Sequence, residues 1–160
     1  MDRIIDLDLG IQPEAAVSGA VVIQTESSTV LTFNAMRPTD EMSPYGGPYM
    51  TDAGTAIFRF KRCLATRFGY PNDEARGGIL RFKDTVYGIY EVQNSSWIRD
   101  TIRDNRYRFP NTSDDYIGRH LVFAFHDSTF ECLTDDFEYE VSTEPYATIL
   151  GRIAERVCAE

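Results

Sequence analysis

The segment from His126 to Cys132 holds the densest run of chemically reactive side chains in the chain. It reads His-Asp-Ser-Thr-Phe-Glu-Cys, so an imidazole, two carboxylates, two hydroxyls and a thiol lie within seven residues. A thiol beside an imidazole suggests a thiolate nucleophile, and a carboxylate beside an imidazole suggests a general base oriented by the acid. Which of these pairs can form depends on how the segment folds.

The run from Arg119 to Leu133 predicts a β-hairpin whose turn is Asp127-Ser128. Residues alternate between two kinds on both sides of that pair, as they do in strands with one buried face. A two-residue loop places His126 opposite Thr129. The core face would carry Leu121, Phe123, Phe125, Phe130 and Cys132, and the polar face would carry Ala124, His126, Thr129 and Glu131.

This register separates Cys132 from His126, because their side chains point to opposite faces of the sheet. Cys132 is therefore predicted to be a small buried apolar residue. His126 and Glu131 share the polar face as diagonal neighbours, roughly 7–8 Å apart at the backbone. The hairpin thus predicts either a general base, His126 oriented by Glu131 or Asp127, or a polar sheet face closed by structural hydrogen bonds, with Asp127 capping its own turn.

A metal site built from His120, His126, Glu131 and Asp127 conflicts with the spacing of the two histidines. They lie about 20 Å apart along one predicted strand, so one ion cannot bind both. The sequence also lacks the glycine-rich phosphate loops and the nucleophile-elbow motif. We therefore predict no metal and no cofactor.

Further candidate site residues lie in a loop and near a strand–helix junction. The loop 71–74 reads Pro-Asn-Asp-Glu, and its amide and two carboxylates suit a cation or a substrate amine, or else ordinary turn chemistry. The stretch 85–97 carries aromatic and acidic side chains around the end of a predicted strand. The candidate ligand-binding residues are Asn72, Asp73, Glu74, Tyr87, Glu91 and Trp97.

Basic residues form two groups. The first comprises Arg59, Lys61, Arg62 and Arg67; it suits a bound carboxylate or phosphate, or equally ion pairs with the acidic strand at 136–140. The second group, at 99–108, alternates with aspartates, which is typical of a solvated helix face with intrahelical pairs.

The composition describes one folded domain spanning residues 1–160. Hydrophobic residues make up 42% and aromatics 12%, as in globular proteins. The net charge of −9 repels nucleic acid and anionic membranes, and it suits a cationic small molecule or a basic protein partner. No apolar run is long enough to span a bilayer, no signal core is present, and three widely spaced cysteines fit neither a disulfide framework nor a metal site. We therefore expect a cytoplasmic protein that binds neither nucleic acid nor membrane.

Successive strand patterns with short links predict an antiparallel sheet. A long irregular loop is expected at 37–54, where prolines and glycines are frequent. The strands are expected at 19–33 (a hairpin), 55–64, 85–92, 119–133 and 137–141, with helices at 97–105 and 143–157. The sequence therefore predicts an α+β fold of mainly antiparallel β-sheet, a sandwich or a partly open barrel, with a short middle helix and a C-terminal helix.

Three motifs resemble, in their order, a family of uncharacterised bacterial proteins. They are PNDEA at 71–75, YGxYEVxNSxWI at 87–98 and HxVFxFHDSTFEC at 120–132. The family pattern continues after the first motif with Gly-His-Pro-Leu, where this chain has Gly-Gly-Ile-Leu at 77–80, so a family histidine is missing. The resemblance implies a shared fold and no particular activity. It directs attention to Tyr87, Glu91, Asn94, Trp97, His126 and Asp127.

Three functions remain open from the sequence. The leading hypothesis is a small binding module whose ligand or protein partner lies between the loop 68–78, the junction 90–97 and the hairpin end 126–131. The second is a cofactor-independent enzyme, a lyase, isomerase or hydrolase, with His126 as general base. The third is an acidic inhibitor or immunity-type protein that blocks a basic partner.

Overall fold

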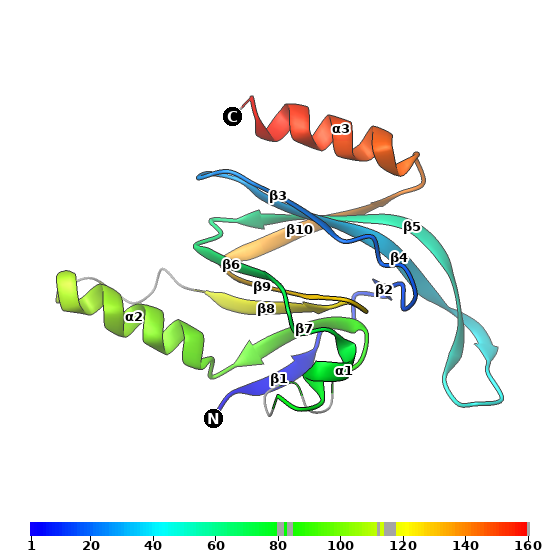
Figure 1. Ribbon diagram of the computed structural model, residues 1–160, viewed down its shortest axis with the longest axis horizontal. Coiled ribbons are helices and arrows are strands. Elements are labelled where there is room, and N and C mark those ends of the chain that lie inside the picture. Colours follow the sequence, from blue (N-terminus) through cyan, green and yellow to red (C-terminus); the bar gives the residue numbers. More distant parts are fainter. Residues whose placement is uncertain (80–81, 83–84, 112, 114–117, 160) are drawn as a thin grey trace.

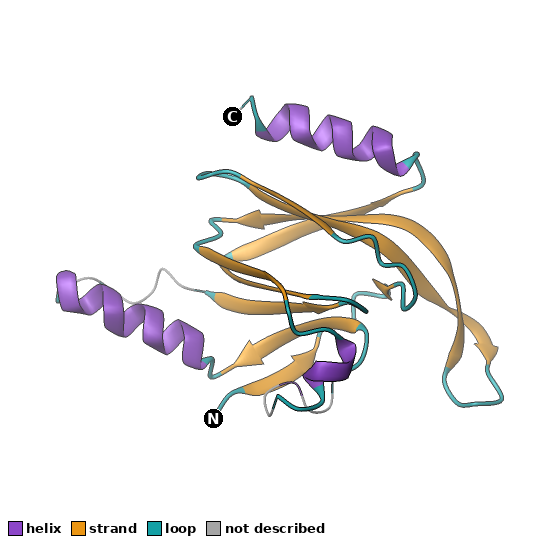
Figure 2. Cartoon of the chain, in the orientation of Figure 1, coloured by secondary structure: helices purple, strands orange, loops and turns teal. Residues whose placement is uncertain are grey.

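The computed structural model describes residues 1–79, 82, 85–111, 113 and 118–159, and these form two antiparallel sheets and three helices (Figure 1; Figure 2). The predicted α+β fold of mainly antiparallel sheet is confirmed. In chain order the elements are β1 (Arg3–Asp6), β2 (Gln12–Pro13), β3 (Val21–Gln24), β4 (Thr29–Met42), β5 (Pro48–Lys61), β6 (Ala65–Gly69), α1 (Asp73–Arg76), β7 (Gly88–Gln93), α2 (Ser96–Arg108), β8 (Arg119–Ala124), β9 (Thr129–Thr134), β10 (Asp136–Ser142) and α3 (Tyr146–Val157).

The two sheets pack face to face around an aromatic core. The first sheet has the order β1-β7-β8-β9-β6, and the second has the order β10-β5-β4-β2, with β3 also paired to β4. Phe58 of the second sheet meets Phe123 of the first edge-on at 4.9 Å between ring centroids, and Phe33 meets Phe125 at 5.4 Å. Such tilted pairs add to the hydrophobic free energy of burying the rings, so they fix how the sheets face each other.

The outer face of each sheet is covered separately. The predicted C-terminal helix, α3, lies over the second sheet (Figure 1) and buries Ile149, Ile153 and Val157 against Val30 and Ile57. A second apolar cluster, smaller than the aromatic core between the sheets, lies on the outer face of the first sheet. The helix α2 begins as expected after its N-cap, Ser95, and it buries none of its residues.

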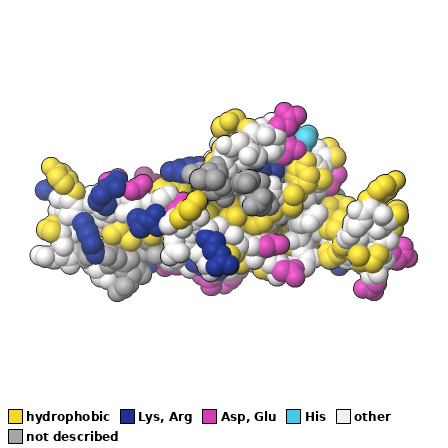
Figure 3. Space-filling view, turned by 90° about the horizontal axis from the view of Figure 1, so that it is seen from below, with side chains coloured by type: hydrophobic (Ala, Val, Ile, Leu, Met, Phe, Trp, Pro, Cys, Tyr) yellow, Lys and Arg dark blue, Asp and Glu magenta, His cyan; other side chains and the backbone are white. Residues whose placement is uncertain are grey.

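The prediction of an irregular loop at 37–54 is wrong. Here β4 and β5 continue as a two-stranded arm that extends beyond the sandwich, with Gly46 and Gly47 at positive φ in the turn between them (Figure 1). The pairing is irregular next to Pro38, and this break hides the two-residue strand period in the sequence. Hydrophobic side chains collect at the end of the molecule that this arm forms (Figure 3). Its exposed hydrophobic residues are Met42, Tyr45 and Tyr49.

The hairpin formed by β8 and β9 has the predicted faces and a different register. Ala124 lies opposite Thr129, and the Phe125 N–H donates to the carbonyl oxygen of Ser128 at 2.9 Å, so the turn is centred on His126 and Asp127, one residue earlier than predicted. This pairing differs from the predicted one by two residues, so every side chain keeps its face but changes its neighbours. All five predicted core-face residues are buried in the core, including Cys132.

Candidate functional site

Asp73, Tyr87 and His126 meet at the turn of this hairpin and form what we call the hairpin-end cluster. The Nδ1–H of His126 donates to Oδ2 of Asp73 at 2.8 Å, and the Tyr87 hydroxyl donates to the same oxygen at 2.7 Å. The hydroxyl oxygen also lies 3.3 Å from Nδ1. The side chain of His126 is 44% exposed, and histidine atoms reach the surface beside acidic side chains in Figure 3. Three of the predicted site residues therefore act as one group.

The short helix α1 brings Asp73 to the turn. Asn72 caps this helix, because its side-chain oxygen accepts from the backbone N–H of Ala75 at 3.1 Å. Asp73, the first helical residue, also donates its backbone N–H to the carbonyl oxygen of His126 at 2.9 Å. Asn72 therefore caps the helix that positions Asp73, and Glu74 is exposed on the same helix.

Arg76 is a supporting residue that the sequence reasoning missed. Only 1% of it is exposed, and its guanidinium donates to the carbonyl oxygen of Phe125 at 2.6 Å and to Ser128 and Thr129 at 3.3 Å. These bonds hold the turn that carries His126. Its position three residues after Asp73 could have indicated this supporting role, because residues three apart lie on the same side of a helical turn.

The shared carboxylate sets the charge of the hairpin-end cluster. The hydrogen bond from Tyr87, followed by that from His126, lowers the pKa of Asp73 to about 2. The hydrogen bond to the Asp73 carboxylate raises the pKa of His126, and the corresponding bond raises the pKa of Tyr87. Asp73 is therefore ionised at neutral pH and holds the His126 proton on Nδ1, which leaves Nε2 available; Nε2 lies 3.9 Å from Oδ1 of Asp127.

Tyr87 also lines a cavity of about 590 Å³, which we call the Tyr87 pocket. It lies between the edge of the first sheet and the β4–β5 arm, and its size is typical of small-molecule sites. Two carboxylates, Asp6 and Asp8, and a second tyrosine, Tyr90, line it as well. Among its described lining residues there is no lysine or arginine. Its apolar wall includes Leu7, Ile11, Pro38, Met50 and Ile89.

The pairing predicted between His126 and Glu131 is wrong. Glu131 accepts from the other histidine, His120, whose Nε2 lies 3.0 Å from Oε2 of Glu131. The shifted register makes these two residues diagonal neighbours on the outer face of the first sheet. Nδ1 of His120 lies 2.8 Å from Oγ of Ser95, and all three residues are buried. We call these three residues the His120 network. Glu131 also lies 4.0 Å from Arg67, and the Ser95 hydroxyl accepts from the backbone N–H of Ile98 at 3.2 Å, so these buried polar groups are paired, as expected for a closed sheet face.

The remaining predicted site residues lie near the His120 network and away from the hairpin end. The ring of Trp97 packs edge-on to His120 at 5.2 Å, and the Arg67 guanidinium lies 3.8 Å from the centre of the Trp97 ring. Glu91 forms an ion pair with Arg119 at 2.7 Å. The single site predicted between three segments is therefore divided, and only the loop 68–78 and the hairpin end meet.

The basic groups pair largely with acids. Arg59 lies 2.8 Å from Glu140, and Lys61 lies 2.7 Å from Glu138, so two members of the first group pair with the acidic strand β10, which was one of the two predicted alternatives. Arg62 pairs instead with Asp135 at 2.7 Å. On α2 the guanidinium of Arg103 lies 2.7 Å from Asp100, as expected for a solvated helix face.

Comparisons with known proteins give no relative. No protein-family model matches the chain, and no curated protein and no solved structure matches it significantly. None of the described helices is both long and apolar enough to cross a membrane. In the part of the chain that the structure describes, no three His, Cys, Asp or Glu side chains are grouped to hold a metal ion.

Proposed function

We propose that the protein is a binding module for a small organic cation, held in the Tyr87 pocket beside the hairpin-end cluster. The observation that supports this most is the double role of Tyr87, which is one of the lining residues of the pocket while its hydroxyl is fixed by Asp73. A wall residue held in one position before binding loses little conformational freedom when a ligand arrives, which favours affinity.

The chemistry of the lining favours a positive charge. Asp6 and Asp8 supply carboxylates, and two aromatic residues of a type that attracts cations, Tyr87 and Tyr90, are also among the lining residues. Burial raises the pKa of Tyr90, and the charge of Asp6 adds to this effect. The apolar wall suits the hydrocarbon part of the same ligand.

Isothermal titration calorimetry with phenethylamine tests this proposal. Near pH 7 the amine is protonated, while 2-phenylethanol has a similar shape and no charge. We expect the amine to bind several-fold more tightly, because the exposed carboxylates of Asp6 and Asp8 attract its charge and a charge-assisted hydrogen bond is stronger than a neutral one. Equal affinities, or no binding of the amine, would overturn the proposal.

Two variants with the same change of net charge sharpen the result. The double substitution Asp6→Asn, Asp8→Asn removes the carboxylates of the pocket, and Asp100→Asn, Asp104→Asn removes two exposed carboxylates of α2. We expect only the first to weaken binding of phenethylamine. A similar loss in both would mean that net charge, and not the Tyr87 pocket, attracts the amine.

The hydrogen bond between Asp73 and His126 favours a second candidate function, general-base catalysis without a cofactor. A carboxylate that fixes Nδ1–H leaves Nε2 to accept a proton from water or a substrate. Hydrolysis of p-nitrophenyl acetate tests for this. We expect a rate that increases as pH rises through the pKa of His126, and that falls to the uncatalysed rate in His126→Gln. An unchanged rate in that variant would exclude this candidate.

A further inference from the structure

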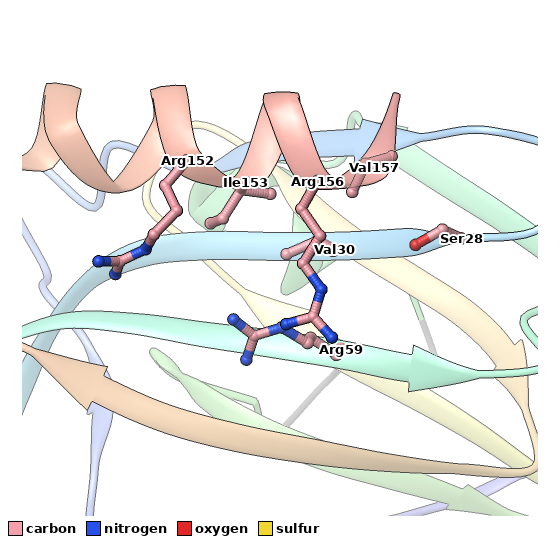
Figure 4. Close-up of a pocket in the computed structure, with 7 residues that line it drawn as sticks. All are labelled: Ser28, Val30, Arg59, Arg152, Ile153, Arg156 and Val157. Atoms are coloured by element: carbon pink, nitrogen blue, oxygen red, sulfur yellow. The ribbon is translucent and has the colours of Figure 1, made fainter. Parts of the chain in front are cut away.

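Three arginines line a second, smaller cavity, of about 140 Å³, between α3 and the second sheet. Figure 4 shows the side chains of Arg152 and Arg156 reaching from α3 toward the sheet, while Arg59 comes from β5. The hydroxyl of Ser28 and the apolar side chains of Val30 and Ile153 complete the lining. We call this space the arginine cavity.

This gathering of positive charge is unusual in an acidic chain. Arg152 and Arg156 are four residues apart on one helix, where like charges repel. Arg59 and Arg152 each have one carboxylate neighbour, Glu140 at 2.8 Å and Glu144 at 2.7 Å. A guanidinium carries five N–H donors, so one such neighbour leaves donors that can bind a further anion.

We infer that the arginine cavity binds a phosphate group, either as inorganic phosphate or as the end of a small phosphate monoester. The planar guanidinium matches two phosphate oxygens at once, and donors from several guanidinium groups can bind the remaining oxygens. Ser28 offers a further hydroxyl donor, and the buried side chains of Val30 and Ile153 form an apolar floor beneath the guanidinium groups. The cavity has roughly ten times the volume that holds one water, which admits a phosphate group and excludes a large ligand.

Amide chemical shifts of the ¹⁵N-labelled protein test this inference. Inorganic phosphate and glycerol phosphate are titrated separately, with sodium chloride at equal ionic strength as the reference. We expect saturable shifts in α3 and at the neighbouring residues of β5. Tighter binding of glycerol phosphate would identify a monoester as the source, and equal binding would identify the bare group. The inference is overturned if neither compound gives saturable shifts there beyond those of chloride.

Substitutions on the exposed side of α3 complete the experiment. Arg156→Gln and Arg152→Gln should each weaken phosphate binding by about tenfold or more, because each removes charge-assisted hydrogen bonds. Arg156→Lys should lose less, since it keeps the charge without the fork. Arg103→Gln is the matched control: it removes an exposed helical arginine paired with Asp100 and should leave the affinity unchanged. Equal affinity in the wild type and both α3 glutamine variants would also overturn the inference.

Discussion

Asp73 and His126 are joined by two hydrogen bonds, although 53 residues separate them in the sequence. One joins the carboxylate to the imidazole at 2.8 Å, and the other joins the backbone N–H of Asp73 to the carbonyl oxygen of His126 at 2.9 Å. The helix α1 and the hairpin turn are therefore fixed to each other at one point. This contact also orients Tyr87, which lines the pocket proposed to bind an organic cation.

The substitution Asp73→Asn should lower the pKa of His126 toward its ordinary value of 6.5, because the carboxylate is the main cause of the raised pKa. The measurement is an NMR titration of the imidazole protons. Asp127→Asn is the control; Asp127 lies farther away, at 3.9 Å from Nε2, so its loss should lower the pKa less. If Asp127→Asn has the larger effect, the carboxylate that orients His126 is misassigned.

The contribution of this pair to folding should depend on pH in a defined direction. The pKa of His126 is raised above 6.5, so its contribution is complete below that pH and is lost as pH rises through the folded-state value. The pKa of Asp73 is lowered from 3.8 to about 2, so its contribution is complete above pH 3.8 and is lost as pH falls toward 2. The difference in unfolding free energy between the wild type and His126→Gln, measured in urea, should therefore be largest between these limits. A difference that grows above pH 8 would contradict this.

Arg76→Met should loosen the hairpin turn. It leaves the carbonyl oxygens of Phe125 and Ser128 without their donor, so we expect a loss of about 2 kcal/mol in unfolding free energy. The pKa of His126 should also move toward 6.5, because the turn no longer holds the imidazole against Asp73. Arg103→Met, on the exposed face of α2, is the control for loss of a guanidinium. Lower stability with an unchanged pKa of His126 would show that Arg76 does not position the imidazole.

Glu131→Ala should be strongly destabilising because it leaves His120 buried without its acceptor. We expect a loss of about 3 kcal/mol in a urea unfolding experiment. Glu138→Ala removes a carboxylate that is exposed at the surface and paired with Lys61, so it should change stability little. Similar effects of the two substitutions would mean that the His120 network does not stabilise the fold.

Two glycine substitutions should act in opposite directions. A Cβ at Gly88 would lie 2.8 Å from the hydroxyl of Tyr90, so Gly88→Ala should displace that ring and cost about 1–3 kcal/mol. At Gly151, in α3, a Cβ meets no atom within 4 Å, and alanine there should stabilise the helix by about 0.5–1 kcal/mol. Melting temperatures of the two variants check both signs, and stabilisation by Gly88→Ala would show that Tyr90 is not held as described.

The faces of the central hairpin were predictable, and its register was not. Strand parity alone places Phe130 and Cys132 in the core, and a shift by two residues leaves parity unchanged. The position of the turn is also held by Arg76, which donates to the carbonyl oxygens on both sides of the turn from 49 and 52 residues away. No local pattern in the turn carries that information, so the partner of Glu131 was assigned to the wrong histidine.

The β4–β5 arm is a second feature that the local sequence did not predict. Prolines and glycines between 37 and 54 favour a loop by composition, yet they occur here at irregular pairings and in the turn of two long strands. The Tyr87 pocket depends on this arm, since Pro38 and Met50 form part of its wall. Tyr87 was predicted as a binding residue, but its partners Asp6 and Asp8 lie more than 70 residues away in the sequence and carry no motif.

The most direct test of the proposed function is an NMR titration that locates the bound cation. Phenethylamine is added to the ¹⁵N-labelled protein near pH 7, where the amine is protonated, and 2-phenylethanol is added to a second sample. We predict saturable shifts in residues 6–8 and 86–90 with the amine, much smaller ones with the alcohol, and a strong reduction in the variant Asp6→Asn, Asp8→Asn. Shifts that are absent from these residues, or equal for the two compounds, would contradict the proposal.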